Sequence, residues 1–178
     1  MRNVLGFLIV LGVMGCGAKA QQPSPVQEPR KPEPTRTLQT GPVEITQKNK
    51  LQQPSWTIRG ESSRVEIADK ASGDLKKVSG TIYTKAQPSA TFTANQGSAN
   101  QANNLLTLSG DVVLVAKDPE STLKADHVKW LPERELIQAT GNVTVVTKDY
   151  RLGPFPKLLA TPDLKKVGTP DQFEGVKP

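Results

Sequence analysis

The sequence predicts an all-β fold that follows an export signal and an unpacked linker. Two observations predict the β class: apolar and polar residues alternate in short segments such as Leu106–Leu114, and no segment keeps a helical period over ten residues. A third observation concerns how the strands are organised. Glycine-centred strands recur at Gly80, Gly110 and Gly141, at intervals of 30 and 31 residues. A period of this size indicates one supersecondary unit that stacks on copies of itself.

Residues 1–15 predict a lipoprotein signal peptide. A basic start, Met1-Arg2-Asn3, is followed by an apolar run that ends at Gly15. A helix of twelve residues rises about 18 Å and cannot cross a hydrocarbon core of about 30 Å. The run therefore predicts export rather than a membrane span.

The apolar run ends in Val13-Met14-Gly15-Cys16, which resembles a bacterial lipobox. This pattern predicts lipid attachment at Cys16, the alternative being an ordinary signal peptide with a chance cysteine. We therefore expect a cell-envelope protein that is lipid-anchored and faces the periplasm, at either the inner or the outer membrane.

Residues 16–52 predict a lipidated N-terminus and a Pro-rich disordered linker. They contain six of the fifteen prolines and few large apolar side chains, so little burial offsets the entropy cost of ordering them. The folded domain is expected over residues 53–160, and residues 161–178 are expected to form a C-terminal tail.

Each repeat is expected to consist of two strands and a turn. The turn-forming residues Asn103-Asn104 and Pro132-Glu133-Arg134 fall midway between successive glycines. A glycine inside a strand marks a bulge, a bend or the close approach of another backbone. Gly80, Gly110 and Gly141 are therefore predicted to be the positions at which the strands bend.

Alternation through the repeat glycines gives one apolar face. Its members are Leu106, Leu108, Val112, Leu114, Ile137, Ala139, Val143 and Val145. These side chains either fill a closed core or line an open trough, and the alternation is compatible with both.

The composition excludes several classes of protein. The chain has one cysteine and one histidine, so neither an internal disulfide nor a Cys/His zinc site can be assembled. His127 lies beside Asp126 without a cluster of further ligands, which is typical of a surface residue. We expect no metal site, no cofactor and no enzymatic activity, because no plausible acid/base pair is present.

Nucleic acid is not an expected partner. Residues 53–150 carry eleven basic and eleven acidic side chains, so the net charge of +6 arises at the ends of the chain. A nucleic-acid-binding protein concentrates lysine and arginine on its folded face.

Two segment pairs resemble the OstA-like repeat of the lipopolysaccharide-export proteins LptA and LptC. The first pair is FTAN from Phe92 with LTLSGDVVL from Leu106, and the second is LKADHVKW from Leu123 with IQATGNVTV from Ile137. The resemblance covers roughly residues 55–150. It implies an open antiparallel β-jellyroll whose interior holds acyl chains and whose end strands pair with the next jellyroll.

On this resemblance, the apolar face would line the lipid-binding trough. The chain would be a membrane-anchored component of lipopolysaccharide or related glycolipid export that passes acyl chains to a neighbouring jellyroll. Its partners would be the glycolipid, other OstA-like jellyroll proteins and an ABC transporter membrane complex. We expect Trp56–Arg59 and Thr144–Lys148 to be the pairing edges. The alternative is a structural or adaptor envelope lipoprotein with a closed β core that binds only protein partners.

Overall fold

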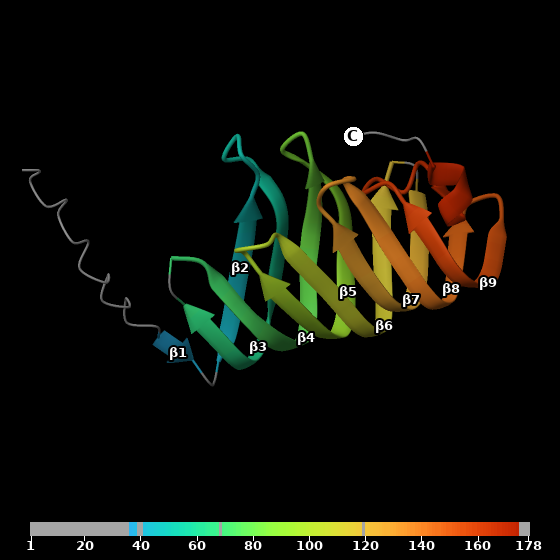
Figure 1. Ribbon diagram of the computed structural model, residues 1–178. Helices are drawn as coiled ribbons and strands as arrows, with labels where there is room; N and C mark the ends of the chain where they lie inside the picture. The colour runs from blue at the N-terminus through green and yellow to red at the C-terminus, as the bar shows by residue number, and fades with distance from the viewer. Residues whose placement is uncertain (1–35, 39–40, 68, 119, 175–178) are drawn as a thin grey trace, which may run out of the picture. The chain divides into compact units, whose positions relative to one another are not determined.

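Alternating side chains give each long segment a β conformation, and the segments join into one antiparallel sheet. The computed structural model describes residues 36–38, 41–67, 69–118 and 120–174. Their ten-stranded sheet has the order β1-β3-β4-β5-β6-β7-β8-β9-β10, with β2 also paired to β3 (Figure 1). The elements are β1 Arg36–Leu38, β2 Pro42–Lys48, β3 Pro54–Ile67, β4 Ala71–Thr84, β5 Gln87–Asn100, β6 Leu105–Lys117, β7 Glu120–Leu131, β8 Leu136–Thr147, β9 Arg151–Ala160, β10 Val167–Gly168 and the 3₁₀ helix η1 Pro170–Phe173. The predicted all-β class is confirmed.

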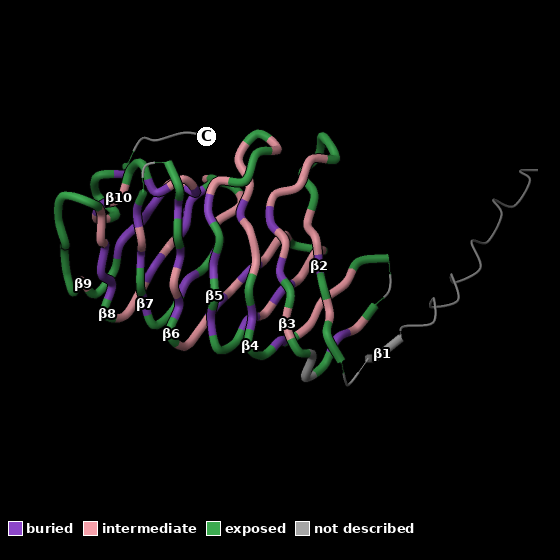
Figure 2. The backbone as a smooth tube through the Cα atoms, turned by 180° about the vertical axis from the view of Figure 1, so that it is seen from behind, coloured by how far each residue is buried: buried purple, intermediate pink, exposed green. Residues whose placement is uncertain are grey.

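The sheet folds over on itself into two layers. Strands β3 to β8 contain 12 to 14 residues each and bend near the middle, so each strand contributes to both layers (Figure 1). We call the layer that contains β2 and the β4–β5 turn the first layer, and the layer that contains β1 and the β5–β6 turn the second layer. Buried and exposed residues alternate along much of the strands (Figure 2), and buried apolar side chains of both layers pack into one cluster.

Gly110 and Gly141 lie at the bends of β6 and β8. Gly110 has φ +75° and is followed by Asp111 at φ +48°, and Gly141 has φ +76° and is followed by Asn142 at φ +49°. The registers shift at these pairs, because β6 and β8 each contain one residue more than both of their neighbours there. The left-handed region suits Gly, Asn and Asp better than other residues, so this local sequence favours the bend.

Strand β7 bends without an extra residue, between Asp126 and His127. Both side chains are exposed, and buried positions change parity across them, from Leu123 and Ala125 to Val128. Two consecutive outward residues therefore keep the apolar side chains pointing inward on both sides of the bend.

The prediction of a bend at Gly80 is wrong. In β4 the positive φ lies at Lys77, with φ +49°, three residues earlier. Gly80 instead allows close packing, because a Cβ there would clash with the backbone oxygen of Thr57 and the ring of Phe92. The position needs a missing side chain rather than an unusual backbone conformation.

The folded domain begins earlier than the predicted boundary at residue 53. Both β1 and β2 fall in the segment predicted as a linker, and they share one register against β3, from Arg36 opposite Ile67 to Pro42 opposite Glu61. They therefore form one interrupted edge strand. Ile45, which is only 3% exposed, and partly buried Val43 pack this strand against the core, so two apolar side chains offset the polar composition that suggested disorder.

The predicted C-terminal tail also contains ordered structure. Strand β10 pairs with the end of β9, and η1 follows it, with Phe173 fully buried against Leu136 and Leu159. In the described part of the chain, no helix is long and apolar enough to cross a membrane.

Neither segment predicted as a pairing edge is an edge. Trp56–Arg59 belongs to β3, which pairs with both β2 and β4, and Thr144–Lys148 overlaps β8, which pairs with β7 and β9. The described edges are β1 with β2 at one end of the sheet and β9 with β10 at the other.

Candidate functional site

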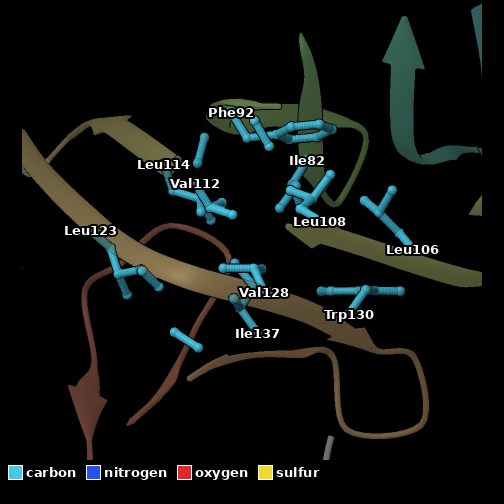
Figure 3. Packing of buried hydrophobic residues seen from close by; sticks show 14 of the residues in the cluster. Ile82, Phe92, Leu106, Leu108, Val112, Leu114, Leu123, Val128, Trp130 and Ile137 are labelled. Atoms are coloured by element: carbon cyan, nitrogen blue, oxygen red, sulfur yellow. The ribbon is translucent and has the colours of Figure 1, made fainter. Parts of the chain in front are cut away.

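The two layers enclose one apolar interior, which contains the residues predicted as the apolar face. All eight are between 0 and 3% exposed and belong to a single cluster of buried side chains. Figure 3 shows Leu106, Leu108, Val112, Leu114 and Ile137 sharing one space with buried side chains of β4, β5 and β7, such as Ile82, Phe92 and Val128. The structure therefore brings together Leu106, Leu108, Val112, Leu114, Ile137, Ala139, Val143 and Val145.

The strand registers order the interior into two continuous rows across the sheet. The first-layer row runs Ile45, Ile58, Gly80, Phe92, Leu114, Leu123, Val145, Leu152. The second-layer row runs Leu75, Gly97, Leu108, Val128, Ala139, Leu158. The first row joins eight strands, so it spans seven spacings of about 4.8 Å, or about 34 Å.

In this structure the interior is filled by the side chains of the protein. The two glycines in the rows are positions where a neighbouring side chain occupies the space: Phe92 lies over Gly80, and Ile58 lies over Gly97. The filled core, one of the two possibilities that alternation left open, is the arrangement present. A foreign hydrocarbon chain can enter only if the two layers move apart.

Two side-chain hydrogen bonds between described residues cross the mouth of the interior, opposite the bends. The indole Nε1 of Trp56 in the first layer donates to Asn104 Oδ1 in the β5–β6 turn over 2.9 Å. In the same turn, Gln101 Nε2 donates to the carbonyl oxygen of Thr46 over 2.6 Å. Both bonds lie near the β2 end of the sheet and tie the two rims together there.

A loop after β9 covers another part of the mouth. Leu164 is 4% exposed and belongs to the buried cluster of the interior. The loop starts at the end of β9, which lies in the second layer. Its residues Asp163 and Lys165 nevertheless line a hollow together with Pro88 and Lys117 of the first layer. The loop therefore crosses from one layer to the other and inserts Leu164 between them.

The two sheet edges differ in their capacity to accept another strand. On β9, Pro154 and Pro156 lack the backbone N–H that an added strand would need, and β10 covers the end of the strand. Prolines occur in edge strands where the missing N–H would face away from the paired strand, so we expect both prolines to remove donors from the outer edge of β9. At the other edge, β2 contains one proline, Pro42, which is its first residue. The remaining residues of β2 keep their backbone N–H groups.

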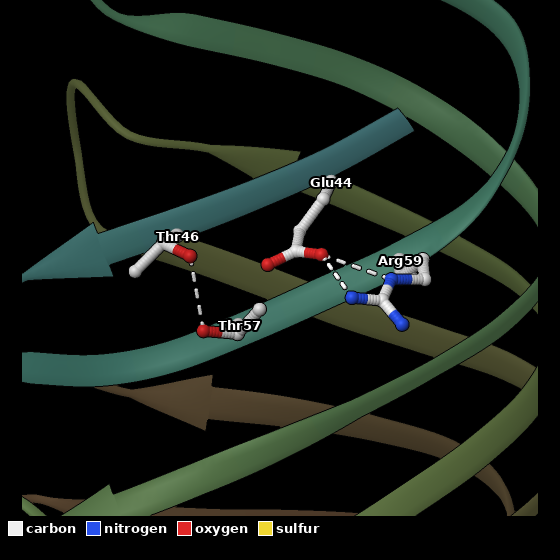
Figure 4. Close-up of polar contacts among 4 residues, drawn as sticks. All are labelled: Glu44, Thr46, Thr57 and Arg59. Carbon is white, nitrogen blue, oxygen red and sulfur yellow. Dashed lines mark hydrogen bonds and ion pairs between the residues drawn. The ribbon is translucent and has the colours of Figure 1, made fainter. Parts of the chain in front are cut away.

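Side chains on the outer face fix β2 to β3. The hydroxyls of Thr46 and Thr57 lie 3.1 Å apart, and the guanidinium of Arg59 donates from both Nε and Nη2 to Glu44 Oε2 (Figure 4). The ion pair is exposed, so it contributes little stability by itself. The contacts join residues that lie opposite each other in the backbone register, Thr46 with Thr57 and Glu44 with Arg59.

The remaining predicted positions stand apart from the interior. Cys16, predicted as the lipid attachment residue, lies outside the described residues. His127 is exposed on the outer side of the β7 bend. Among the residues that the structure describes, no group of three or more His, Cys, Asp and Glu side chains could hold a metal ion.

Sequence reasoning missed two residues of the interior wall. Leu164 stands alone among Pro162, Asp163 and two lysines, a composition that predicts a turn. Trp130 is 5% exposed and forms part of the interior cluster and of two hollows at the mouth. Its place on the alternating pattern of β7 was visible in the sequence, but its position at the mouth was not.

Comparison with known protein families and sequences adds to this geometry. No curated protein sequence matches the chain. The family model LptC, described as lipopolysaccharide-assembly, LptC-related, matches residues 5–149. This is a transport and bridging family and not an enzyme family. Because the match covers more than half of the chain, the protein belongs to the LptC family, which acts in lipopolysaccharide transport in the cell envelope through interactions with lipopolysaccharide and other Lpt proteins.

Proposed function

We infer that the space between the two layers carries the acyl chains of lipopolysaccharide or a related acylated glycolipid. The observation that carries this proposal is the pair of apolar rows, which run across the sheet from strand to strand. The first row continues from buried Ile45 in β2 to Leu152 in β9, which is 48% exposed. A hydrocarbon chain aligned with the rows would meet apolar side chains along its whole length.

Entry of the lipid requires the layers to separate, and the fold offers a hinge for this motion. The layers are joined along one side by the strand bends, where Gly110 and Gly141 have positive φ. On the other side the described rims are tied by the Trp56–Asn104 and Gln101–Thr46 hydrogen bonds and by the Leu164 loop. Separation at the mouth breaks these contacts and leaves the sheet ladders intact.

The energetics suit a carrier that releases its cargo. Burying a chain of about twelve carbons contributes about 10 kcal/mol at about 0.8 kcal/mol per methylene. A bilayer gives the same chain similar burial, and opening the filled interior costs part of the gain. The net affinity is therefore modest.

A neighbouring Lpt jellyroll pairs with the edge formed by β1 and β2, and lipid attachment at Cys16 anchors the chain to its membrane. The prolines of β9 support this choice of edge, because they remove donors from the other one.

The cargo proposal is tested by photocrosslinking in cells. p-Azidophenylalanine replaces Phe92, which is 2% exposed in the first-layer row, and the matched control replaces Thr93, the exposed outward residue beside it. Irradiation should link glycolipid to position 92 and not to position 93. Adducts to protein alone, from a variant that retains its fold, would contradict the cargo role.

A second candidate is an adaptor that binds only protein partners. It is favoured by the filled interior, since the predicted lining residues are 0 to 3% exposed without any lipid. The crosslinking experiment separates the two candidates, because an adaptor gives no glycolipid adduct from position 92.

A further inference from the structure

A hollow lies at the mouth of the interior, between the β2–β3 turn of the first layer and the β7–β8 turn of the second. Its volume is about 300 Å³, at the lower end of the range of small-molecule sites. Both layers contribute to its wall, which includes Asn49, Leu51, Ser55, Thr84, Trp130 and Glu135. A second hollow, of about 560 Å³, adjoins it and shares Asn49, Leu51, Ser55, Trp130 and Glu135.

Two buried polar atoms without a hydrogen-bond partner belong to residues that line this hollow. They are Trp130 Nε1 and Thr84 Oγ1, and across the described residues no other buried side-chain nitrogen or oxygen lacks a partner. Trp130 is itself 5% exposed. Buried polar groups in folded proteins are almost always satisfied, so two exceptions in one hollow need an explanation. A ligand with acceptor oxygens would give both atoms a hydrogen-bond partner and would explain the two exceptions.

The charge around the two hollows is strongly biased. Lys85 lines the first hollow, and Lys48, Lys50 and Lys70 line the second. Glu135 is the one acidic residue in either wall. Within the described ranges, none of the four lysines forms an ion pair. The excess of positive charge favours an anionic ligand.

We propose that this hollow binds a phosphate group carried by the head group of the acylated lipid. Lysine ammonium groups and neutral N–H and O–H donors are together suited to phosphate oxygens. Trp130 also belongs to the wall of the apolar interior, so the site for the head group adjoins the space for the acyl chains. The source of the phosphate rests on the proposed function, whereas the phosphate chemistry rests on the hollow alone.

Binding requires a small local movement. Both unpartnered atoms are covered in this structure, and the Leu51 side chain of the wall is 76% exposed. Changes of side-chain rotamer at a binding surface are common and leave the backbone in place. Entry of a phosphate would therefore shift the signal of the Trp130 indole N–H.

The test follows the two indole N–H signals of the ¹⁵N-labelled full chain by NMR in dodecyl maltoside micelles. Trp56→Phe and Trp130→Phe assign the signals independently. Dodecyl phosphate is titrated in, with further dodecyl maltoside and inorganic phosphate as the comparison ligands. Dodecyl phosphate should shift the Trp130 signal and leave the Trp56 signal, which is already bonded to Asn104, in place.

Charge variants test the lysines. Lys85→Gln and Lys50→Gln should each weaken the dodecyl phosphate effect by about two- to fivefold, as expected for single exposed charges. Lys129→Gln is the matched control, because Lys129 is the exposed neighbour of Trp130 on the outer face of β7. It should leave the effect unchanged.

Three results would overturn the proposal. They are no Trp130 shift, an equal shift with the neutral detergent, or equal weakening by the control variant. An equal shift with inorganic phosphate at the same concentration would reject the lipid as the source. A glycolipid adduct at position 92 together with a silent Trp130 signal would reject this site and leave the cargo proposal standing.

Discussion

The Cδ1 atom of Ile58 in β3 occupies the space that a side chain at Gly97 in β5 would need. A Cβ built on Gly97 would lie 2.7 Å from it. Ile58 belongs to the first-layer row and Gly97 to the second-layer row, so the two layers touch directly at this end of the sheet.

This contact predicts a coupled pair of substitutions. Gly97→Ala should lower the free energy of unfolding by about 1 to 3 kcal/mol, because it overpacks a filled site. Ile58→Val removes the Cδ1 atom and should alone cost about 1 kcal/mol. The double variant should be more stable than the sum of the two losses predicts, as measured by denaturant unfolding. Simple additivity would show that the layers do not meet at these residues.

The bends of the two repeats carry the same hydrogen bond with the partners exchanged. Asn95 of β5 donates to Asp111 Oδ2 of β6 over 2.9 Å, and Asn142 of β8 donates to Asp126 Oδ2 of β7 over 2.8 Å. Asn142→Asp should destabilise the protein by about 1 kcal/mol, since it replaces a hydrogen bond by two facing carboxylates. Adding Asp126→Asn should restore most of the loss in thermal unfolding. If the double variant stays as unstable as Asn142→Asp, the bond has no role in the bend.

The insertion of Leu164 predicts a difference between two leucines. Leu164→Ala should lower the free energy of unfolding by about 2 kcal/mol or more and raise the binding of an apolar dye, because it opens the mouth of the interior. Leu51→Ala is the control: Leu51 is 76% exposed, and its loss should change stability by less than about 0.5 kcal/mol. Similar effects from the two variants would show that Leu164 does not close the interior.

The unequal edges predict where a partner attaches. A cysteine at Glu44, on β2, should form crosslinks in cells to a jellyroll protein of the lipopolysaccharide-export system. Lys157, on β9, is also exposed, and a cysteine in its place should not form these crosslinks. Mass spectrometry of the crosslinked products identifies the partner. Equal yields from both positions, or a yield from Lys157 alone, would contradict pairing at the β2 edge.

In β6 and β8 the residues placed on one apolar face by alternation are all buried, because the bends of these two strands preserve the alternation. The two positive-φ residues at Gly110-Asp111 insert one extra position in β6, and buried residues keep the same parity from Leu106 to Leu114. The sequence pattern can therefore be followed straight through the bend. At Gly80 the same glycine pattern has a different cause, since close packing and backbone bending place the same demand on residue type.

The parts that sequence reasoning missed depend on single side chains and on neighbours. Strand β2 is held by buried Ile45 and partly buried Val43 within a polar segment, and two alternating apolar residues are too few to identify a strand. The loop with Leu164 has the composition of a turn. Alternation predicts a strand at Trp56–Arg59 but gives no information about which strands lie beside it. The edges of the sheet could therefore not be assigned from the sequence.

The prolines of β9 have a consequence for assembly. A sheet that offers free donors at both ends can add identical copies without limit and grow into a filament. Pro154 and Pro156 remove two backbone donors from one end, so we expect strand addition to be weaker there than at the end that contains β2. An end with fewer donors disfavours head-to-tail addition of identical copies, so we expect the isolated protein not to grow into filaments.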